Sequence, residues 1–283
     1  MNTSYKIIID SSGELPEELK RDGHYSNVPL SIDLDGTTFI DDENFDQIDF
    51  LNKVAESPNG PKSACPSPES YMKACEGDAE NVYIITLSGE LSGSYNSALL
   101  ASELYNEEHE DEPKNIHVFN SKSASIGETL IGLKVQEYEE MGCSFEEVVD
   151  KVEKHIASMH TFFVLDTLDT FIKTGRISKL KAGIVSTLNI KPIMASTDEG
   201  AIYNSGQGRG SKGAISKMIE KVVNVTTNPE KKTIAISHCN CPERAEFAKK
   251  QLEKIADFKD IIVVNMSGLS SMYANQGGVI VAV

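Results

Sequence analysis

A serine- and glycine-rich turn joins an apolar segment to a polar, helix-forming segment. Residues 84–98 read IITLSGELSGSYNSA, a strand pattern that passes through a turn into a helix pattern. The first backbone N–H groups of a helix lack partners within it, and the helix dipole adds partial positive charge there. The hydroxyls of Ser92 and Ser94, beside Gly93, would complete a pocket for a carboxylate or phosphate group.

This turn does not match a nucleotide-binding loop. Such a loop reads G-x-x-x-x-G-K-[ST], whereas Gly89 and Gly93 have a different separation and no lysine follows the second glycine. Helix capping alone is the simpler role for these serines, and a cap can also contact an anion. The anion must therefore be identified from the rest of the chain.

Other polar segments supply candidate contacts for an anion. Ser67 is expected to cap a helix that begins at Pro68, which makes the earlier Ser63 the better ligand contact. Arg176 follows a glycine at a predicted helix end, and Arg209 lies in a glycine-rich loop. Arginine binds carboxylate or phosphate through two parallel hydrogen bonds and keeps its charge. A contact with a helix dipole, or an exposed surface position, also accounts for each arginine.

Cysteine and histidine residues offer two further interpretations. Cys65 would be a nucleophile if a base lay beside it, but no histidine is arranged in the sequence for that task. The segment 238–241 (HCNC) has metal-binding residue types without a second cluster at zinc-site spacing. A strand end leading into a helix cap at Asn240 accounts for it. The sequence predicts no metal site and no catalytic residue.

Composition limits the classes of function. The formal net charge of −16 opposes binding to nucleic acid or to an anionic bilayer, because both are polyanions. No apolar run reaches the roughly 18 residues that would span a bilayer, and the first residues lack the features of a signal peptide. The five cysteines are an odd number without framework spacing. We expect a cytoplasmic protein with reduced thiols that is not an integral membrane protein.

Strands and helices alternate in the first half of the chain, where they must position the polar turns. Strands are expected at 6–9, 28–34, 82–87 and 116–119, and helices at 46–56, 68–76, 95–106, 124–141 and 144–159. Such alternation predicts a mainly parallel sheet with crossover helices. Ligands bind beyond the carboxyl ends of such strands. The polar segments 10–12, 87–89 and 120–121, the last being Asn120 and Ser121, should therefore converge on one site.

The second half combines helices with antiparallel pairing. Strands are expected at 161–165, 190–195, 201–203, 233–237, 261–265 and 279–283, and helices at 168–173, 212–223 and 242–255. A hairpin turn at 197–200 introduces the antiparallel pairing, and Pro192 suits a sheet edge or a bulge. We predict an α/β domain at 1–159 and an α+β domain at 160–283.

The motifs, taken in order, resemble those of the DegV family of bacterial fatty-acid-binding proteins over essentially the whole chain. They are IDSSGELP (9–16), VPL (28–30), KSACPSP (62–68), LSGSYNSA (91–98), NSKSAS (120–125), the segment 167–177 and IKPI (190–193). The resemblance implies a two-domain fold, with a mainly parallel N-terminal sheet flanked by helices and a largely antiparallel C-terminal sheet. It also implies one long-chain fatty acid in a tunnel between the domains.

The resemblance also implies how that ligand is held and used. With the strand-end argument added, the carboxylate is expected at the following residues: Ser63, Ser92, Gly93, Ser94, Asn120, Ser121 and Arg176. Burial of the acyl methylenes, at about 0.8 kcal/mol each, would dominate binding. The protein would then be a carrier without catalysis or cofactor, and a partner fatty acid kinase would phosphorylate the presented carboxylate.

The chain departs from the family pattern in two places. Cys65 stands where the family has glutamine, and Ala64 replaces a hydroxyl residue. The family's C-terminal His-x-Gly-Pro-Gly motif is replaced by SSMYANQGG at 270–278, where Tyr273 or Asn275 would be the replacement donor. Two other functions stay open: an enzyme acting on a small carboxylated or phosphorylated metabolite, with Cys65 as its nucleophile, and a ligand-sensing regulatory protein.

Overall fold

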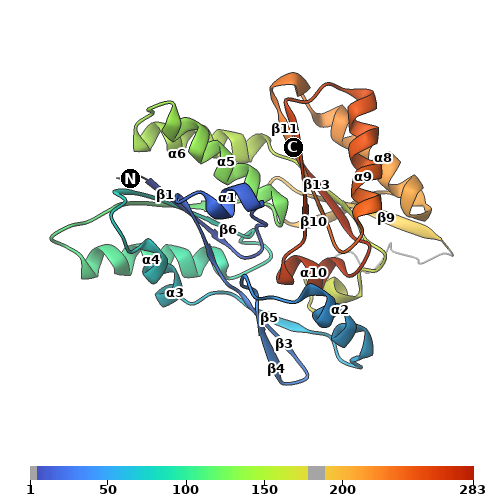
Figure 1. Ribbon diagram of the computed structural model, residues 1–283, viewed down its shortest axis with the longest axis horizontal. Coiled ribbons are helices and arrows are strands. Elements are labelled where there is room, and N and C mark those ends of the chain that lie inside the picture. Colours follow the sequence, from blue (N-terminus) through green and yellow to red (C-terminus); the bar gives the residue numbers. More distant parts are fainter. Residues whose placement is uncertain (1–4, 178–188) are drawn as a thin grey trace.

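The computed structural model describes residues 5–177 and 189–283, which form two halves built on different sheets (Figure 1). The first sheet is parallel, in the order β2-β1-β6-β7. Its strands are β1 (Tyr5–Asp10), β2 (Tyr25–Val28), β6 (Asn81–Thr86) and β7 (Asn115–Asn120). Helices cover both faces, so Ile7, Ile8 and Ile9 are all fully buried. This explains why β1 has a continuous apolar pattern in the sequence.

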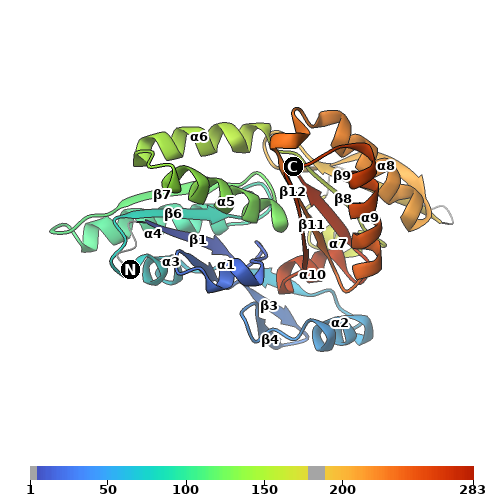
Figure 2. The ribbon, with the colours of Figure 1, turned by 45° about the horizontal axis from the view of Figure 1, so that its top comes forward.

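Two layers of helices enclose the parallel sheet (Figure 2). The helices that follow the strands of this half are α1 (Glu17–Arg21), α3 (Pro68–Cys75), α4 (Ser94–Glu108), α5 (Ile126–Glu140) and α6 (Phe145–Ser158). Helices α3 and α4 pack on one face, with Ile8 and Ile84 in the core between them and the sheet. Helices α5 and α6 pack on the other face over Ile7 and Ile9. The mainly parallel sheet predicted for this half is confirmed.

The single strand predicted at 28–34 is wrong, because the chain leaves the parallel sheet after Val28. Pro29 has no N–H for a strand ladder, and the chain continues into a second, antiparallel sheet in the order β4-β3-β5. The elements of this small region are β3 (Ser31–Leu34), β4 (Thr37–Ile40), α2 (Gln47–Glu56) and β5 (Lys62–Ala64). Strands β4 and β5 were not predicted, since they are short and mostly polar.

The second half is built on a mostly antiparallel sheet in the order β10-β9-β8-β13-β11-β12. Its strands are β8 (Thr161–Val164), β9 (Ile190–Ser196), β10 (Ile202–Arg209), β11 (Thr233–His238), β12 (Asp260–Asn265) and β13 (Val279–Ala282). Pro192 pairs with β10 but lies beyond the end of β8, at a local edge as predicted. The predicted antiparallel character of this half is confirmed, with β11 and β12 as its parallel pair.

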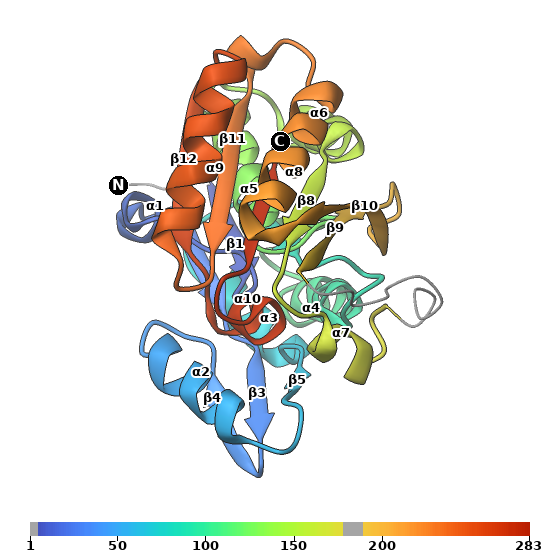
Figure 3. The same ribbon diagram turned by 90° about the vertical axis from the view of Figure 1, so that its right-hand side faces the viewer.

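Helices α8 (Gly210–Val225) and α9 (Pro242–Ile255) cover the outer face of this sheet (Figure 3). The N-cap position of helix α9 is Cys241, and Pro242 is the first residue of the helix. The N-cap predicted at Asn240 is therefore wrong by one position. Asn240 instead adopts a positive φ of 46° in the turn before the cap. The short elements of this half are α7 (Asp169–Lys173), η2 (Pro229–Lys231) and α10 (Gly268–Ala274).

Helix α5 is the shared wall of the two halves. Its first turns carry Ile126 and Leu130, which pack against Ala235 of β11 and Ala282 of β13. The boundary predicted between residues 159 and 160 falls in the turn between α6 and β8. In the described part of the chain, no helix combines the length and apolar character needed to cross a bilayer.

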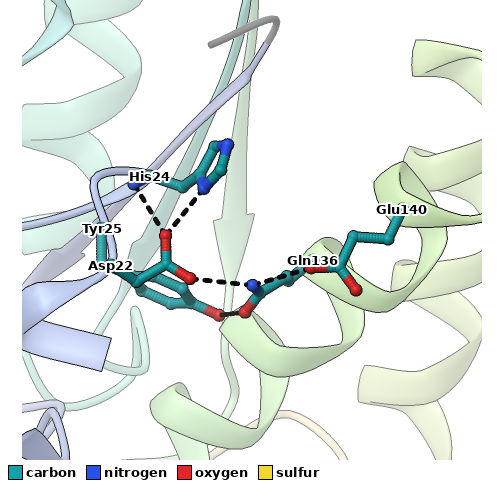
Figure 4. A network of polar contacts seen from close by, with 5 residues as sticks. All are labelled: Asp22, His24, Tyr25, Gln136 and Glu140. Atoms are coloured by element: carbon teal, nitrogen blue, oxygen red, sulfur yellow. Dashed lines mark hydrogen bonds and ion pairs between the residues drawn. The ribbon is translucent and has the colours of Figure 1, made fainter. Parts of the chain in front are cut away.

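A polar network ties α5 to the loop before β2 (Figure 4). The Tyr25 hydroxyl donates to Gln136 Oε1 at 2.8 Å, and Gln136 Nε2 donates to Asp22 at 3.0 Å and to Glu140 at 2.9 Å. The backbone N–H and ring of His24 also contact Asp22. This network fixes the C-terminal end of α5 at the start of the parallel sheet, away from the junction between the halves.

Helix α10 lies at that junction, against α2 and β3 (Figure 1), and no local pattern predicts it. Its start is capped by a residue that is remote in sequence. The buried Asp41 carboxylate accepts the N–H groups of Gly268 at 2.6 Å and Leu269 at 2.8 Å, and the hydroxyl of Ser11 at 2.9 Å. A cap from 227 residues away cannot be read from local sequence.

We expect Asp41→Ala to lower the free energy of unfolding by about 2 to 3 kcal/mol, because two buried N–H groups of α10 lose their acceptor. Urea unfolding at neutral pH measures this change. The matched control is Glu43→Ala, an exposed acid two residues away, which should shift the value by about 0.5 kcal/mol or less. Equal stability of the two variants would contradict the role of Asp41 as the cap of α10.

Candidate functional site

A cavity of about 300 Å³ lies between the two halves, and both contribute to its wall. That volume is at the lower end of the range for small-molecule sites. The first half contributes Ser12, Leu30, Ser63, Ala64, Cys65, Leu87, Leu91, Ser92, Gly93, Ser123, Ala124 and Ser125. The second half contributes Thr161, Phe163, Leu165, Phe171, Arg176, Ser196, Gly200, Ile202, Leu269, Ser270, Tyr273, Ala274 and Ile280. The turns that end β1, β6 and β7 meet at this cavity, as predicted.

Four of the predicted contact residues line the cavity together: Ser63, Ser92, Gly93 and Arg176. Ser63 lies in β5, Ser92 and Gly93 form the turn before α4, and Arg176 follows α7. Cys65 approaches this turn so closely that a Cβ on Gly93 would lie 3.3 Å from its Sγ. Glycine at position 93 therefore leaves space between β5 and α4.

Ser94 lies directly behind Ser92 and does not line the cavity. It is the first residue of α4 and is fully buried. Its backbone N–H donates to the Ser92 hydroxyl at 3.2 Å, and the two hydroxyl oxygens are 3.0 Å apart. Ser92 thus receives one of the otherwise unpaired N–H groups of the helix start, and its own hydroxyl remains at the cavity surface.

Arg176 supplies the positive charge of the site. Among the lining residues in the described part of the chain, it alone carries a charge. Its Nη1 donates to the carbonyl of Thr174 at 2.8 Å, and its Nε lies 3.4 Å from the carbonyl of Leu91, across the junction. A guanidinium has five N–H donors, so further donors are left for an anion. Arg209, the other candidate, is exposed at the end of β10 and does not line the cavity.

Asn120 and Ser121 shape the cavity wall from behind and do not line it. Asn120 Oδ1 accepts the N–H groups of Gly89 and Lys122, both at 3.1 Å. The Ser121 hydroxyl accepts the N–H of Ser123 at 3.1 Å. These bonds fix the turn after β7, so that Ser123 and the following two residues, rather than Asn120 or Ser121, face the cavity.

The β9–β10 hairpin turn closes the cavity from the second half. Gly200 has a φ of +93°, and a Cβ there would collide with the Ser88 hydroxyl and the backbone of Lys122. Its carbonyl accepts a hydrogen bond from that Ser88 hydroxyl at 2.9 Å. Only glycine combines this conformation with so close an approach, so Gly200 fixes the hairpin against the two serine-rich turns.

The remainder of the wall is largely apolar and comes from elements that are remote in sequence. Phe163, Ile202 and Ile280 contribute side chains from three different strands of the antiparallel sheet. The rings of Phe171 and Tyr273 lie 4.6 Å apart between centroids, which joins α7 to α10. A largely apolar wall that also carries hydroxyl groups and one guanidinium suits an amphipathic ligand with a small charged head.

Sequence reasoning missed several hydroxyl residues of the wall. Ser12, Ser123, Ser125, Thr161 and Ser270 all line the cavity, yet each hydroxyl has a partner within the protein. Ser12, Ser123 and Ser125 belong to the motifs at 9–16 and 120–125, which are the signal available in the sequence for them. Of the two replacement donors expected near the C-terminus, Tyr273 lines the cavity and Asn275 does not.

Among the described residues that line the cavity, no histidine, lysine or carboxylate is present to act as a base for the Cys65 thiol. Cys65 is exposed and unpaired at the cavity rim. Histidine is absent from the described lining residues. Within residues 5–177 and 189–283, no group of three or more His, Cys, Asp or Glu side chains is placed to hold a metal ion.

Four acidic side chains are buried just behind the cavity wall: Asp10, Glu14, Asp41 and Glu128. Desolvation raises the pKa of each carboxyl. The pKa of Glu14 rises to about 7 and that of Asp41 to about 6, even though both accept hydrogen bonds. Glu14 Oε2 accepts the hydroxyl of Ser125 at 2.7 Å. The site therefore contains acids that titrate near neutral pH.

Glu14 should make the stability of the fold depend on pH. Its pKa is 4.5 when exposed and about 7 when folded, so its contribution is present below pH 4.5 and is lost as the pH rises to about 7. That loss is on the order of 3 kcal/mol. We expect Glu14→Gln, which cannot ionise, to flatten the decline in unfolding free energy between pH 5 and pH 7.5.

Urea unfolding of the wild type and the variant at both pH values measures the slope. Glu43→Gln, which replaces an exposed carboxylate, is the control and should leave the wild-type slope unchanged. A slope in Glu14→Gln as steep as that of the wild type would show that Glu14 does not titrate in this range.

Comparison with known proteins gives consistent matches over the whole length of the chain. The family model described as "Uncharacterised protein, DegV family COG1307" matches residues 4–283. A DegV domain-containing protein of Streptococcus gordonii is 32% identical over 283 residues, which cover 98% of each chain.

Solved structures with the same fold carry fatty acids. The protein of DegV family COG1307 from Ruminococcus gnavus, refined with vaccenic acid, is 48% identical, with a TM-score of 0.95 over 99% of this chain and 100% of that chain. The Fatty Acid Kinase (Fak) B3 protein of Streptococcus pneumoniae, loaded with linoleic acid, is 32% identical, with a TM-score of 0.88 and 99% coverage of both chains. A DegV family protein of Eubacterium eligens, loaded with heptadecanoic acid, is 27% identical, with a TM-score of 0.88 and 98% coverage of both chains.

Proposed function

The chain belongs to the DegV family, and on that premise we propose that it binds one long-chain fatty acid in the cavity between its two halves. The observation that carries the proposal is an apolar cavity whose wall contains Ser63, Ser92, Gly93 and Arg176, the residue types that would bind an anion. Three related proteins were crystallised with fatty acids. The carboxylate would lie at this group and the acyl chain along the apolar wall.

The physical chemistry of the cavity supports a ligand of this kind. Each buried methylene contributes about 0.8 kcal/mol, so the acyl chain supplies most of the affinity. The head group needs only enough donors to compensate for its lost hydration. Ser63 and Ser92 offer hydroxyls, and Arg176 offers the opposite charge. Ser94, Asn120 and Ser121 would act indirectly, by holding the turns that carry these donors.

The protein would act as a carrier that presents the carboxylate to a separate fatty acid kinase. A related protein is named as the B3 protein of a fatty acid kinase. Ala64, Cys65 and Gly93 are exposed at the proposed head-group end, which supports access by a second protein. The partner would transfer the phosphoryl group, and this chain would supply binding and orientation without a metal or cofactor of its own.

We place this carrier in the cytoplasm. All five cysteines are free, and Cys65 and Cys143 are not buried, as suits a reducing compartment. The acidic surface implied by a net charge of −16 opposes adhesion to nucleic acid and to anionic lipid.

Extraction of the purified protein, followed by mass spectrometry, tests the proposal. We expect about one long-chain fatty acid per protein molecule, and uptake of one oleate by protein from which lipid has been removed. Dissociation should be slow, because the acyl chain must leave an apolar cavity. Protein that contains no fatty acid and takes up no oleate would refute the proposed function. Turnover of a small metabolite by such protein would favour the enzyme alternative.

At the head-group end, loss of a charged donor should weaken fatty acid binding more than loss of a neutral donor. Ser92→Ala removes one neutral donor and should raise the Kd for oleate up to about tenfold, whereas Arg176→Ala should raise it about 10- to 100-fold. Displacement of a fluorescent fatty acid measures both values. Arg209→Ala is the matched control, because Arg209 is an exposed arginine of the same half outside the cavity wall. An equal effect of the two arginine variants would rule out a local role for Arg176.

A further inference from the structure

Three buried serines from remote segments lie together in the cavity wall. Ser12 follows β1, Ser125 precedes α5 and Ser270 belongs to α10, and all three line the cavity. The Ser270 hydroxyl donates to the carbonyl of Ser12 at 3.1 Å, which joins α10 to the loop after β1. Ser125 is joined to the same loop through Glu14, whose Oε2 accepts its hydroxyl at 2.7 Å. Ser12, Ser125 and Ser270 form the serine group of the wall.

Two of these hydroxyls give their hydrogen to acceptors behind the wall. The Ser270 hydrogen goes to the Ser12 carbonyl, and the Ser12 hydroxyl donates to Oε1 of Glu128, a fully buried carboxyl of α5. A hydroxyl has one hydrogen and two lone pairs. Ser12 and Ser270 therefore present oxygen lone pairs, and no hydrogen, to the cavity.

Ser125 keeps its hydrogen within the protein whatever the charge of Glu14. Its hydroxyl oxygen lies 2.7 Å from Glu14 Oε2 and 2.7 Å from the hydroxyl oxygen of Ser237. An ionised Glu14 accepts the Ser125 hydrogen, and Ser237 then donates to Ser125. A protonated Glu14 can donate to Ser125, which then donates to Ser237. In both arrangements Ser125 has a lone pair, and no hydrogen, left for the cavity.

The backbone of Ser125 is strained at this position. Its φ of 60° and ψ of −138° lie in a region that residues with a side chain rarely adopt. Such strain persists where the surroundings fix the residue, and it is common at positions that contact a ligand. The bonds to Glu14 and Ser237 hold the Ser125 side chain in this place.

Ser270 is the member of the serine group best placed to meet a ligand. It is 7% exposed, whereas Ser12 and Ser125 are each 1% exposed. In the described part of the chain, no group donates a hydrogen bond to the Ser270 hydroxyl oxygen, and its two neighbours in the group have no hydrogen to offer. A buried acceptor gains from a donor on whatever fills the cavity. A methylene chain offers no donor, and a carboxylate only accepts.

The proposed carboxylate contacts differ in this respect. Arg176 has only donors, and the Ser92 oxygen accepts the N–H of Ser94 at 3.2 Å. The hydrogen of Ser92 can then point to Ser94 or into the cavity. The wall thus has one set of donors, which suits a carboxylate, and a separate set of acceptors, which suits a hydroxyl.

We propose that Ser270 selects a long-chain fatty acid that carries a hydroxyl group on its chain, and that Ser270 Oγ accepts the hydrogen of this hydroxyl. This inference rests on the proposed function, since it adds a preference among fatty acids to the binding of one. A hydroxyl is favoured over a charged amine, because a neutral group loses less hydration on entering an apolar cavity. A hydroxyl opposite an apolar part of the wall would be buried without a partner, so its place on the chain matters.

Displacement of a fluorescent fatty acid from lipid-free protein tests this preference. The competitors are stearate and three hydroxystearates, with the hydroxyl near the carboxylate, at the middle of the chain or near the methyl end. We expect one of the three to bind about 3- to 10-fold more tightly than stearate, which is the gain from one neutral hydrogen bond. The other two should bind more weakly than stearate, because each buries an unpaired hydroxyl.

Ser270→Ala should remove this gain, so that the same hydroxystearate binds no more tightly than stearate. Ser270→Cys keeps the size of the side chain but offers only a weak acceptor. It should lose the gain as well, and it decides the question if Ser270→Ala does not fold. Ser205→Ala is the control, because Ser205 lies in β10 outside the cavity wall, and it should keep the gain of the wild type.

The inference would be overturned if none of the three hydroxystearates binds more tightly than stearate. A gain that persists in the Ser270 variants would overturn it as well. Either result leaves the proposed function standing, because stearate still binds. Protein that binds neither stearate nor any hydroxystearate would refute the proposed function itself.

Discussion

The turns at the carboxyl ends of the parallel strands are buried against the second half of the molecule, and their unpaired N–H groups must therefore find acceptors there. Water cannot satisfy them, and an unpaired buried N–H costs about 1 to 3 kcal/mol. Asp10 accepts the N–H groups of Leu87 and Ser12, and Asp41 accepts two at the start of α10. The positions of the cavity wall depend on these two carboxylates.

The same constraint explains why the cavity lies between the halves. In the first half, polar turns follow the ends of the parallel strands and face the cavity. The antiparallel sheet presents apolar side chains such as Phe163 and Ile280 to the same space. The serine-rich turns of the first half and Arg176 of the second half thus supply donors, and the antiparallel sheet adds an apolar surface. A ligand with a small anionic head and a long apolar tail is compatible with both sides at once.

An acidic protein that binds an acid must manage repulsion as well as attraction. The buried acids that organise the turns also raise the free energy of any further negative charge nearby. Arg176 offsets that charge directly because it is positive, and the start of α4 adds the partial positive charge of the helix dipole. Recognition of the head group and the ionisation of the buried acids are therefore coupled.

Local patterns in the sequence determined most of the longer elements and the serine turns, because strand and helix periodicity and capping act over a few residues. The parallel sheet, the helix expected at 144–159 and the presence of Ser63 and Ser92 in the cavity wall followed from them. Tertiary structure alone decided which side chains face the cavity. Strand order, the cap of α10 by Asp41, and the positions of Asn120 and Ser121 behind the wall depend on contacts between remote segments. Such contacts follow from packing and from the pairing of buried polar groups, which a one-dimensional pattern does not encode.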